Sequence, residues 1–250
     1  MNIPKLKSIN HERTKNISKN IVFSFFLKGI SIGTTFLLVP LTLHSLDQEQ
    51  YGIWLTLSSI IGWVSLFDIG LGNGFRNKFA EALALKDDAL AKTYVSTTFF
   101  LLSSIIGSVL ILFIIINNFL NWGSILNTSI ISRRNLSILA LINFTFFALR
   151  FILGIIASML LADQKSAIVD LLNVSGNLIS LAVIYILLQI GKTSLLILGF
   201  TLSATPVFVL IIAYFFVFCG KYSSYKPSIK YIDIKYLKDL MGLGFMFFIP

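Results

Sequence analysis

Charged and amide side chains stand inside long apolar stretches of this sequence. Lys28 and Arg150 are cations within such stretches, and Asp68 and Asp170 are carboxylates. An ionisable side chain in an apolar helix is costly, so it usually faces a bundle interior or a wet cavity. Ammonium and guanidinium groups in such a cavity would suit an anionic cargo such as a phosphate. Three amides complete the candidate cavity residues: Asn143, Asn173 and Asn177.

Lys28 and Asp68 are expected at similar depths in neighbouring segments. With a rise of about 1.5 Å per residue, they lie roughly 13 Å and 10 Å from the same side of the membrane. A structural ion pair between them is one interpretation, and a functional role in the cavity is the other. Arg150 lies near the middle of its segment, and the sequence offers no carboxylate of matching depth. This excess cation favours an anionic cargo.

Polar residues repeat at helical spacing on four of the segments. Residues three, four or seven apart share one face of a helix. Polar faces are unfavourable in lipid, so we expect them to point inward at a shared cavity. The four sets are Ser24, Lys28, Ser31 and Thr35; Ser58, Ser65, Asp68 and Gly72; Asn143, Arg150 and Gly154; and Asp170, Asn173, Asn177 and Ser180.

The composition is typical of an integral membrane protein. Of the 250 residues, 56% are hydrophobic and 12% are charged, whereas soluble domains carry about 25% charged residues. Crossing a bilayer takes about 20 apolar residues. We therefore expect an all-α, polytopic transmembrane helix bundle. Its spans are predicted at about 20–43, 51–75, 95–117, 136–162, 167–190 and 195–219, with the start of a seventh at 241–250.

The basic residues between the spans predict the orientation. Residues 1–19 form a flexible basic tail, 220–240 a basic loop, and 76–94 an amphipathic helix at the membrane surface. Of the 20 Lys and Arg residues, 15 fall on the side of these segments and three on the other. Cytoplasmic loops carry such an excess, so the N-terminus is expected in the cytoplasm. The same topogenic role explains the positive charge without a nucleic-acid partner.

Small residues and one proline predict where helices meet or bend. Small residues four apart allow close helix contacts, and Pro206 predicts a kink in the sixth span. The small pairs are Gly29 with Gly33, Gly70 with Gly74, Ser103 with Gly107, and Gly154 with Ser158.

No pattern typical of an enzyme is present in the sequence. Nucleophile–base pairs, metal-ligand spacings and paired carboxylates are missing. The glycines at 70, 72 and 74 do not have the spacing of a nucleotide loop. Cys219 is the only cysteine, which excludes an internal disulfide. We expect neither a metal nor a cofactor.

A resemblance to a known family is carried by residues 51–84, which read YGIWLTLSSIIGWVSLFDIGLGNGFRNKFAEALA, and by AKTYVSTT shortly after. This stretch resembles polysaccharide flippases of the O-antigen and capsule type, within the MATE-like superfamily of exporters. The run FDIGLGNG with the following RNK is its most specific part. Topology and hydropathy support the resemblance over the rest of the chain, which would match an N-terminal lobe.

The resemblance implies a two-lobed bundle of about twelve spans, a central cationic cavity and alternating access. The implied cargo is an undecaprenyl-diphosphate-linked oligosaccharide, moved across the bacterial cytoplasmic membrane. Lys28 and Arg150 would contact the diphosphate, on the basis of their position and charge. Membrane lipids and polysaccharide-assembly proteins are the other implied partners.

Three alternatives remain open on the sequence. A cation-coupled drug or metabolite exporter of the same superfamily would need a coupling carboxylate, for which Asp68 and Asp170 are candidates. A membrane-embedded enzyme would need a large catalytic loop, and none of the predicted loops is large enough. An inactive fragment is the third. Residues 241–250 are too few to cross a bilayer, so we expect a truncated form without flippase activity of its own.

Overall fold

The computed structural model describes the backbone of residues 3–64 and 68–236, and the side chains of residues 20–60 and 72–236. Its α-helices are α1 (Ile3–Ser45), α2 (Gln48–Val64), α3 (Asp68–Leu85), α4 (Asp88–Asn117), α5 (Trp122–Ile125), α6 (Arg133–Leu153), α7 (Ile155–Ala162), α8 (Ser166–Gln189) and α9 (Leu195–Cys219). Three 3₁₀ turns follow, η2 (Ser223–Tyr225), η3 (Ile229–Tyr231) and η4 (Ile234–Tyr236). The described part of the chain is therefore all-helical, as predicted.

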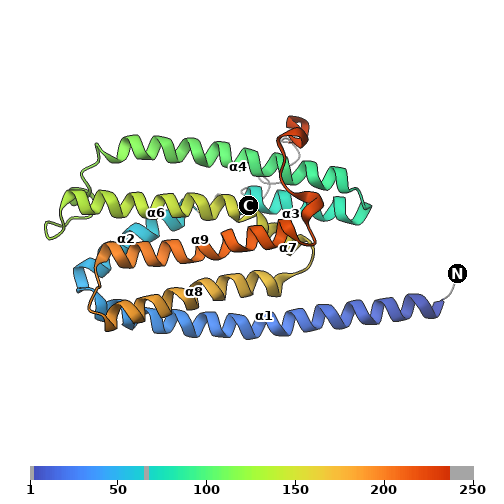
Figure 1. Cartoon of the computed structure of the whole chain (residues 1–250), viewed down its shortest axis with the longest axis horizontal. Helices are drawn as coiled ribbons and strands as arrows, with labels where there is room; N and C mark the ends of the chain where they lie inside the picture. The colour runs from blue at the N-terminus through green and yellow to red at the C-terminus, as the bar shows by residue number, and fades with distance from the viewer. Residues whose placement is uncertain (1–2, 65–67, 237–250) are drawn as a thin grey trace, which may run out of the picture.

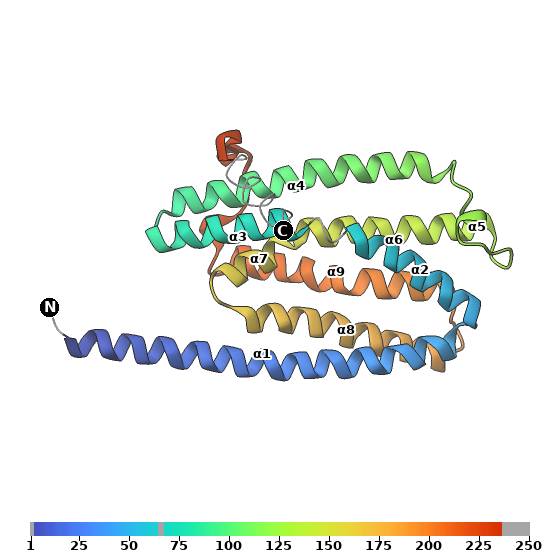
Figure 2. The same ribbon diagram turned by 180° about the vertical axis from the view of Figure 1, so that it is seen from behind.

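Five of the helical elements lie side by side in a row. The row runs α1, α8, α9, α6, α4, and each of these helices packs against the next (Figure 1). The short helix α2 lies across one face of the row, where it contacts α6 and α9, and α3 packs against α4 and α7 (Figure 2). Because α1 packs mainly against α8, it forms one edge of the bundle.

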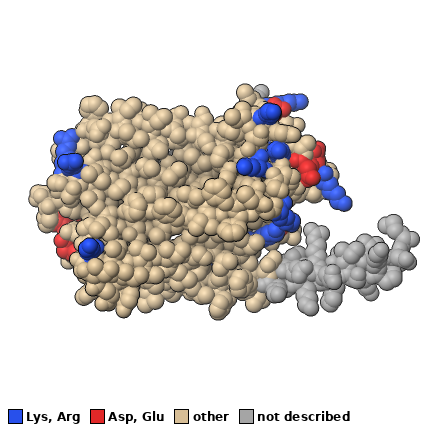
Figure 3. All heavy atoms as spheres, viewed as in Figure 1, with Lys and Arg blue, Asp and Glu red and all other residues tan. Residues whose placement is uncertain are grey.

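Within the described residues, length and composition allow five helical segments to cross a membrane: Asn20–Ser45, Asp88–Asn117, Arg133–Ala162, Ser166–Gln189 and Leu195–Cys219. Charged side chains gather at the two ends of the bundle, and an uncharged belt separates them on the face seen in Figure 3. Such a belt is what the hydrocarbon core of a bilayer requires. The protein is therefore a multi-pass membrane protein.

The second predicted span corresponds to two helices, α2 and α3. They lie on either side of residues 65–67, which are outside the described residues. Helix α2 begins at the end of the bundle where α1 ends, and α3 ends at the opposite end (Figures 1 and 2). A sixth span made by this pair stays a prediction. The expected start of a seventh, at 241–250, also lies outside the described residues.

The described backbone of residues 3–19 is helical, which differs from the flexible tail predicted for residues 1–19. Helix α1 begins at Ile3 and continues without a break to Ser45, over 43 residues or about 65 Å. The reason lies in the residues: Pro4 falls in the first turn, where a proline is tolerated, and no glycine follows before Gly29.

The prediction of a surface helix at residues 76–94 is wrong. The structure divides this segment between the end of α3 and the start of α4, which pack against each other. Lys86 turns the chain with a φ of 56°, and the Asp87 carboxylate caps α4 by accepting the backbone N–H of Leu90 at 2.9 Å. The apolar side chains that suggested a membrane surface pack instead into the protein core.

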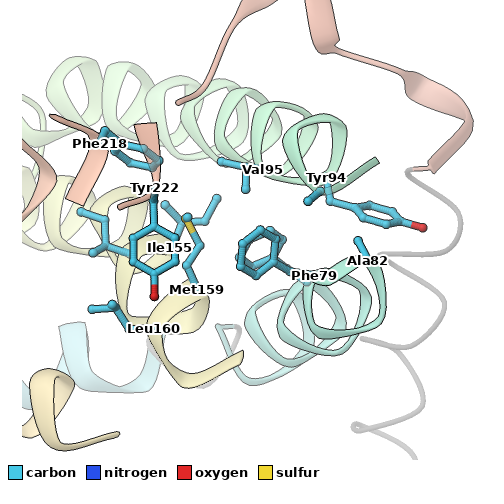
Figure 4. Packing of buried hydrophobic residues seen from close by; sticks show 12 residues of the cluster. Phe79, Ala82, Tyr94, Val95, Ile155, Met159, Leu160, Phe218 and Tyr222 are labelled. Carbon is cyan, nitrogen blue, oxygen red and sulfur yellow. The ribbon is translucent and has the colours of Figure 1, made fainter. Parts of the chain in front are cut away.

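Two apolar clusters occupy opposite ends of the bundle. One joins α3, α4, α7 and the end of α9, and includes Phe79, Val95 and Met159 (Figure 4). The other joins α2, α6 and α9, and includes Ile53, Leu139 and Leu198. The polar candidate residues of α6 and α8 fall between these clusters along their helices. The clusters therefore fix the helices whose middle sections carry the candidate site.

Two close helix contacts occur at glycines outside the predicted pairs, and the pair Gly70–Gly74 stays a prediction. A Cβ added at Gly176 of α8 would lie 3.1 Å from the Pro206 Cα of α9, and one at Gly199 would clash with a Leu139 methyl group. A Cβ added at Gly29, Gly33 or Gly107 meets nothing within 4 Å. Gly154 lies in the break between α6 and α7, where its nearest neighbour is the Phe151 carbonyl. Gly176 allows this close approach because it has no side chain at the point where Pro206 of α9 touches α8.

Asp163 ties the α7–α8 turn to the segment after α9. Its carboxylate accepts hydrogen bonds from the Tyr222 hydroxyl at 2.6 Å and the Lys221 ammonium at 3.1 Å, and Lys165 lies at 3.2 Å. Partial burial alone would raise the pKa of Asp163, but these three donors outweigh it and hold the pKa below its ordinary value. Burial and the Asp163 hydrogen bond also raise the pKa of Tyr222.

The Asp163 contacts predict an acid-sensitive stability. A carboxylate with a lowered folded-state pKa contributes stability above its unfolded pKa, which is about 4, and loses it as the pH falls through the folded value. We expect the thermal midpoint in detergent to fall as the pH drops below about 4. Asp163→Asn should be less stable at pH 7 and should lose part of this acid dependence. Equal pH dependence in both proteins would contradict the assignment.

Candidate functional site

The polar face of α1 packs against α8. Ser24 donates to Ser166 at 3.2 Å, and the Asn177 amide donates to Ser31 at 3.3 Å. The two pairs advance in the same direction along both helices, so α1 and α8 are parallel. Part of the predicted inward stripe therefore bonds between neighbouring helices.

Lys28 lies between these two pairs, on a part of α1 that α8 leaves open. By the same register it comes level with residues 170–173, which include Asp170 and Asn173. Lys28 and Asn173 are exposed and Asp170 is half-buried. Among the described residues no carboxylate lies within 4.0 Å of the Lys28 ammonium, whose Nζ is 5.9 Å from the centre of the Phe25 ring. Lys28, Asp170 and Asn173 thus lie at the same depth along the α1–α8 pair.

Arg150 stands in the last turn of α6, just before the break at Gly154. Its backbone carbonyl accepts the Gly154 N–H at 2.9 Å. Its side chain is exposed and makes no ion pair with any side chain that the structure describes. The structure thus leaves the Arg150 guanidinium open for a ligand or for a second protein surface.

The depth of Arg150 follows from the packing of α6 on α9. Leu139 lies against Gly199, and one turn further Ser203 donates to the Asn143 carbonyl oxygen at 2.8 Å. The two helices therefore run in parallel, with positions 60 apart at one level. Arg150 comes level with about Leu210.

The same reasoning relates Arg150 to Lys28. Helix α8 runs opposite to α9, with Gly176 against Pro206, so Leu210 comes level with about Leu172. Lys28 has this depth as well. The two cations are therefore at one level of the bundle, but α8 and α9 stand between α1 and α6 in the row (Figure 1). The structure does not bring them into contact.

Asn143 is a buried amide whose NH2 group makes no hydrogen bond to the described residues. Its side chain is 3% exposed; its oxygen accepts from Ser203, while its Nδ2 has no partner among the described residues. Ser58 Oγ of α2 is also buried and without a partner there. Ser58 comes four residues after Trp54, which lies against Gly199 of α9. Asn143 therefore belongs to a buried polar contact between α6 and α9.

Asp68 is the first residue of α3. Its side chain lies outside the described residues, so the expected Lys28–Asp68 ion pair stays a prediction. No group of three or more His, Cys, Asp and Glu side chains in the described part of the chain could hold a metal ion.

The sequence interpretation missed the polar residues of α9. Ser203 bonds Asn143, and Thr205 is hydrogen-bonded to Ser180 of α8. The alternation of Thr201, Ser203 and Thr205 in an apolar run was the available signal. Each of these hydroxyls can also bond its own helix, as Thr201 and Thr205 do at 2.8 Å, so spacing alone does not identify their partners.

No protein-family model matches the sequence, and no curated protein matches it. Solved structures match over 92% of the chain. They include an outward-facing multidrug resistance MATE family transporter of the MOP superfamily, with a TM-score of 0.71 and 13% identity. The chain has the fold of one half of a MATE transporter. A structure of MATE in complex with MaD3S also matches, with a TM-score of 0.71 and 13% identity.

A third match is a MOP superfamily transporter from Pyrococcus furiosus, described by the reverse polarity of its binding pocket; its TM-score is 0.65 and its identity 14%. The chain spans about half the length of these transporters, 51% or 52% of each. The likeness confirms a MATE-like helix bundle. The polysaccharide cargo stays a prediction, because a likeness of fold does not distinguish it from a drug.

Proposed function

We propose that the chain forms one lobe of a membrane exporter that works by alternating access. The fold of half a MATE transporter supports this, because such motion needs two lobes that rock about a site between them. The exposed edge helix α1, with Lys28 on its open side, would then face the second lobe. The 15-to-3 distribution of basic residues supports an N-terminus in the cytoplasm.

The cargo we propose is an oligosaccharide linked to a lipid diphosphate, carried across a bacterial cytoplasmic membrane. One observation carries this choice: Lys28 and Arg150 are exposed cations at one depth, and neither has an acidic partner among the described residues. A cation in an apolar belt is costly without a counter-charge, and a diphosphate supplies that charge. Polysaccharide-assembly proteins would hand over the cargo.

A cation-coupled drug or metabolite exporter is the second candidate. It is favoured by the match to a multidrug resistance transporter and by the half-buried Asp170 within α8. A carboxylate in that position could exchange a proton or a sodium ion during transport. This candidate predicts a cationic or neutral cargo, because a carboxylate attracts the opposite charge.

The two candidates differ in a transport assay with two cargoes. Because alternating access needs two lobes, this lobe is reconstituted in vesicles together with a second lobe. The vesicles contain a fluorescent polyprenyl-diphosphate sugar, whose translocation is followed by dithionite quenching, or ethidium and a sodium or proton gradient. We expect translocation of the lipid cargo above that of empty vesicles, and no gradient-driven ethidium transport. Ethidium transport without lipid translocation would reject the proposed cargo in favour of the second candidate.

A further inference from the structure

The segment after α9 contains a tandem repeat that forms two identical turns. Residues 220–236, which we call the strap, include the triplet Ile-Lys-Tyr twice, as η3 (Ile229–Tyr231) and η4 (Ile234–Tyr236). Each triplet folds into one 3₁₀ turn. The strap crosses the ends of α3 and α4 and extends beyond α4 (Figure 1).

Both repeats dock on α4 through the same kind of backbone contact. The residue before each triplet donates its backbone N–H to a hydroxyl of α4: Ser228 to Ser96 and Asp233 to Thr97, each at 3.1 Å. Ser96 and Thr97 are almost fully buried. The strap is thus fixed to α4 at two successive points one repeat apart.

The tyrosine of each triplet also packs against α4. The Lys92 ammonium lies 4.5 Å from the centre of the Tyr231 ring, and the Tyr236 ring lies 5.2 Å from the Tyr94 ring. Earlier in the strap, Tyr222 is buried in the cluster of Figure 4. Tyr222 and Tyr236 thus face inward, whereas Tyr231 packs beside Lys92 and stays 41% exposed.

The isoleucine and lysine of each triplet are left on the outside. Ile229 and Ile234 are 73% and 74% exposed, and Lys230 and Lys235 are exposed beside them. An isoleucine so exposed loses the stabilisation that burial would give it. Both repeats have the same arrangement, so the exposure of these side chains follows from the way each repeat docks on α4.

The position of the strap identifies what can cover these side chains. It is anchored to residues 88–97, the first turns of α4, where a candidate membrane span begins. Lys and Arg residues gather at this end of the bundle (Figure 3). The surface of the bilayer must therefore pass close to the strap.

We propose that the two Ile-Lys pairs bind anionic phospholipids at this surface. The isoleucines enter the boundary between headgroups and acyl chains, and the lysines contact lipid phosphates. Charge supports lipid over a second copy of the chain: the exposed charges of residues 226–236 are three lysines and Asp233, so two such surfaces would repel each other. The proposal holds for either orientation of the bundle and for either candidate cargo.

The test measures how deeply the strap enters the bilayer. In a Cys219→Ser background, Ile229→Cys and Ile234→Cys carry a nitroxide, and Ser224→Cys, an exposed strap residue outside the repeats, is the matched control. The proteins are placed in phosphatidylcholine vesicles with or without one-third phosphatidylglycerol. We expect both repeat positions to collide more with oxygen than with a water-soluble nickel chelate, most clearly with phosphatidylglycerol, and position 224 to favour the chelate.

Removing the lysines should weaken immersion only in the anionic vesicles. Each Lys near an anionic surface contributes about a fivefold preference for anionic over neutral vesicles. Replacing both lysines, by Lys230→Gln with Lys235→Gln, should therefore reduce this preference up to about 25-fold. In unlabelled proteins that keep both isoleucines, phosphatidylglycerol should raise the midpoint of thermal unfolding more for the parent than for this double variant. Two results would overturn the proposal. One is access of the chelate to both repeat positions in both lipids. The other is equal protection of the nitroxides from the chelate in detergent and in vesicles, which would indicate that protein and not lipid covers these positions.

Discussion

Arg150→Ala should reduce transport of the lipid-diphosphate cargo about 10- to 100-fold, because a hydrogen bond to a charged group contributes about 1.5–3 kcal/mol. The structure leaves this guanidinium exposed and without an ion-pair partner among the described residues. Its removal should therefore cost little stability. The measurement is the initial rate of dithionite-resolved translocation, normalised to the amount of folded protein in the vesicles.

Two further variants give this prediction its specificity. Arg150→Lys should retain part of the activity, because the charge remains while the planar fork that grips a phosphate is lost. Arg134→Ala is the matched control: this arginine lies in the first turn of α6, exposed at the end of the bundle, and its loss should leave transport unchanged. A fully active, stably folded Arg150→Ala protein would remove Arg150 from the cargo site.

Gly176→Leu should disrupt the packing of α8 against α9. The added Cβ would meet the Pro206 Cα at 3.1 Å and its Cβ at 3.3 Å. Backbone cannot rotate away as a side chain can, so α8 and α9 must move apart. Overpacking of this kind costs about 1–3 kcal/mol, and occasionally more. We expect a lower thermal midpoint in detergent and a smaller yield of monodisperse protein.

Gly29→Leu is the control for this change. It adds the same side chain to a membrane helix, but a Cβ there meets nothing within 4 Å. Its thermal midpoint should stay near that of the parent. If both variants lost the same stability, the loss would come from leucine at any helical glycine, and the α8–α9 contact would not explain it.

The helical class and the membrane bundle could be predicted because they depend on local composition. Long apolar runs cross a bilayer only as helices or closed barrels, since their backbone groups must bond within the protein. The surface helix at 76–94 was wrong because Phe79, Leu83 and Leu90 at helical spacing suit a buried face as well as a membrane surface. Only the turn at Lys86 and Asp87 decides between them, and a single lysine at positive φ leaves no pattern in the sequence.

The candidate site was predictable in kind but not in arrangement. Lys28 and Arg150 stand out because charge in an apolar run is rare. Their separation by α8 and α9 depends on the order of helices in the row, which hydropathy does not contain. Gly176 illustrates the same limit: a small residue becomes a contact only when Pro206 of another helix reaches the same level.

The pairing of α1 with α8 has a consequence for how the protein is made. Ser31 and its partner Asn177 are 146 residues apart in the chain. A ribosome that adds about 5–20 residues per second needs roughly 7–30 s to synthesise that stretch. For this time α1, with Lys28 inside its apolar span, has to reside in the membrane without its neighbour. Helix α1 is thus completed by a helix that is made much later, and a helper that shelters Lys28 during translation would act in this interval.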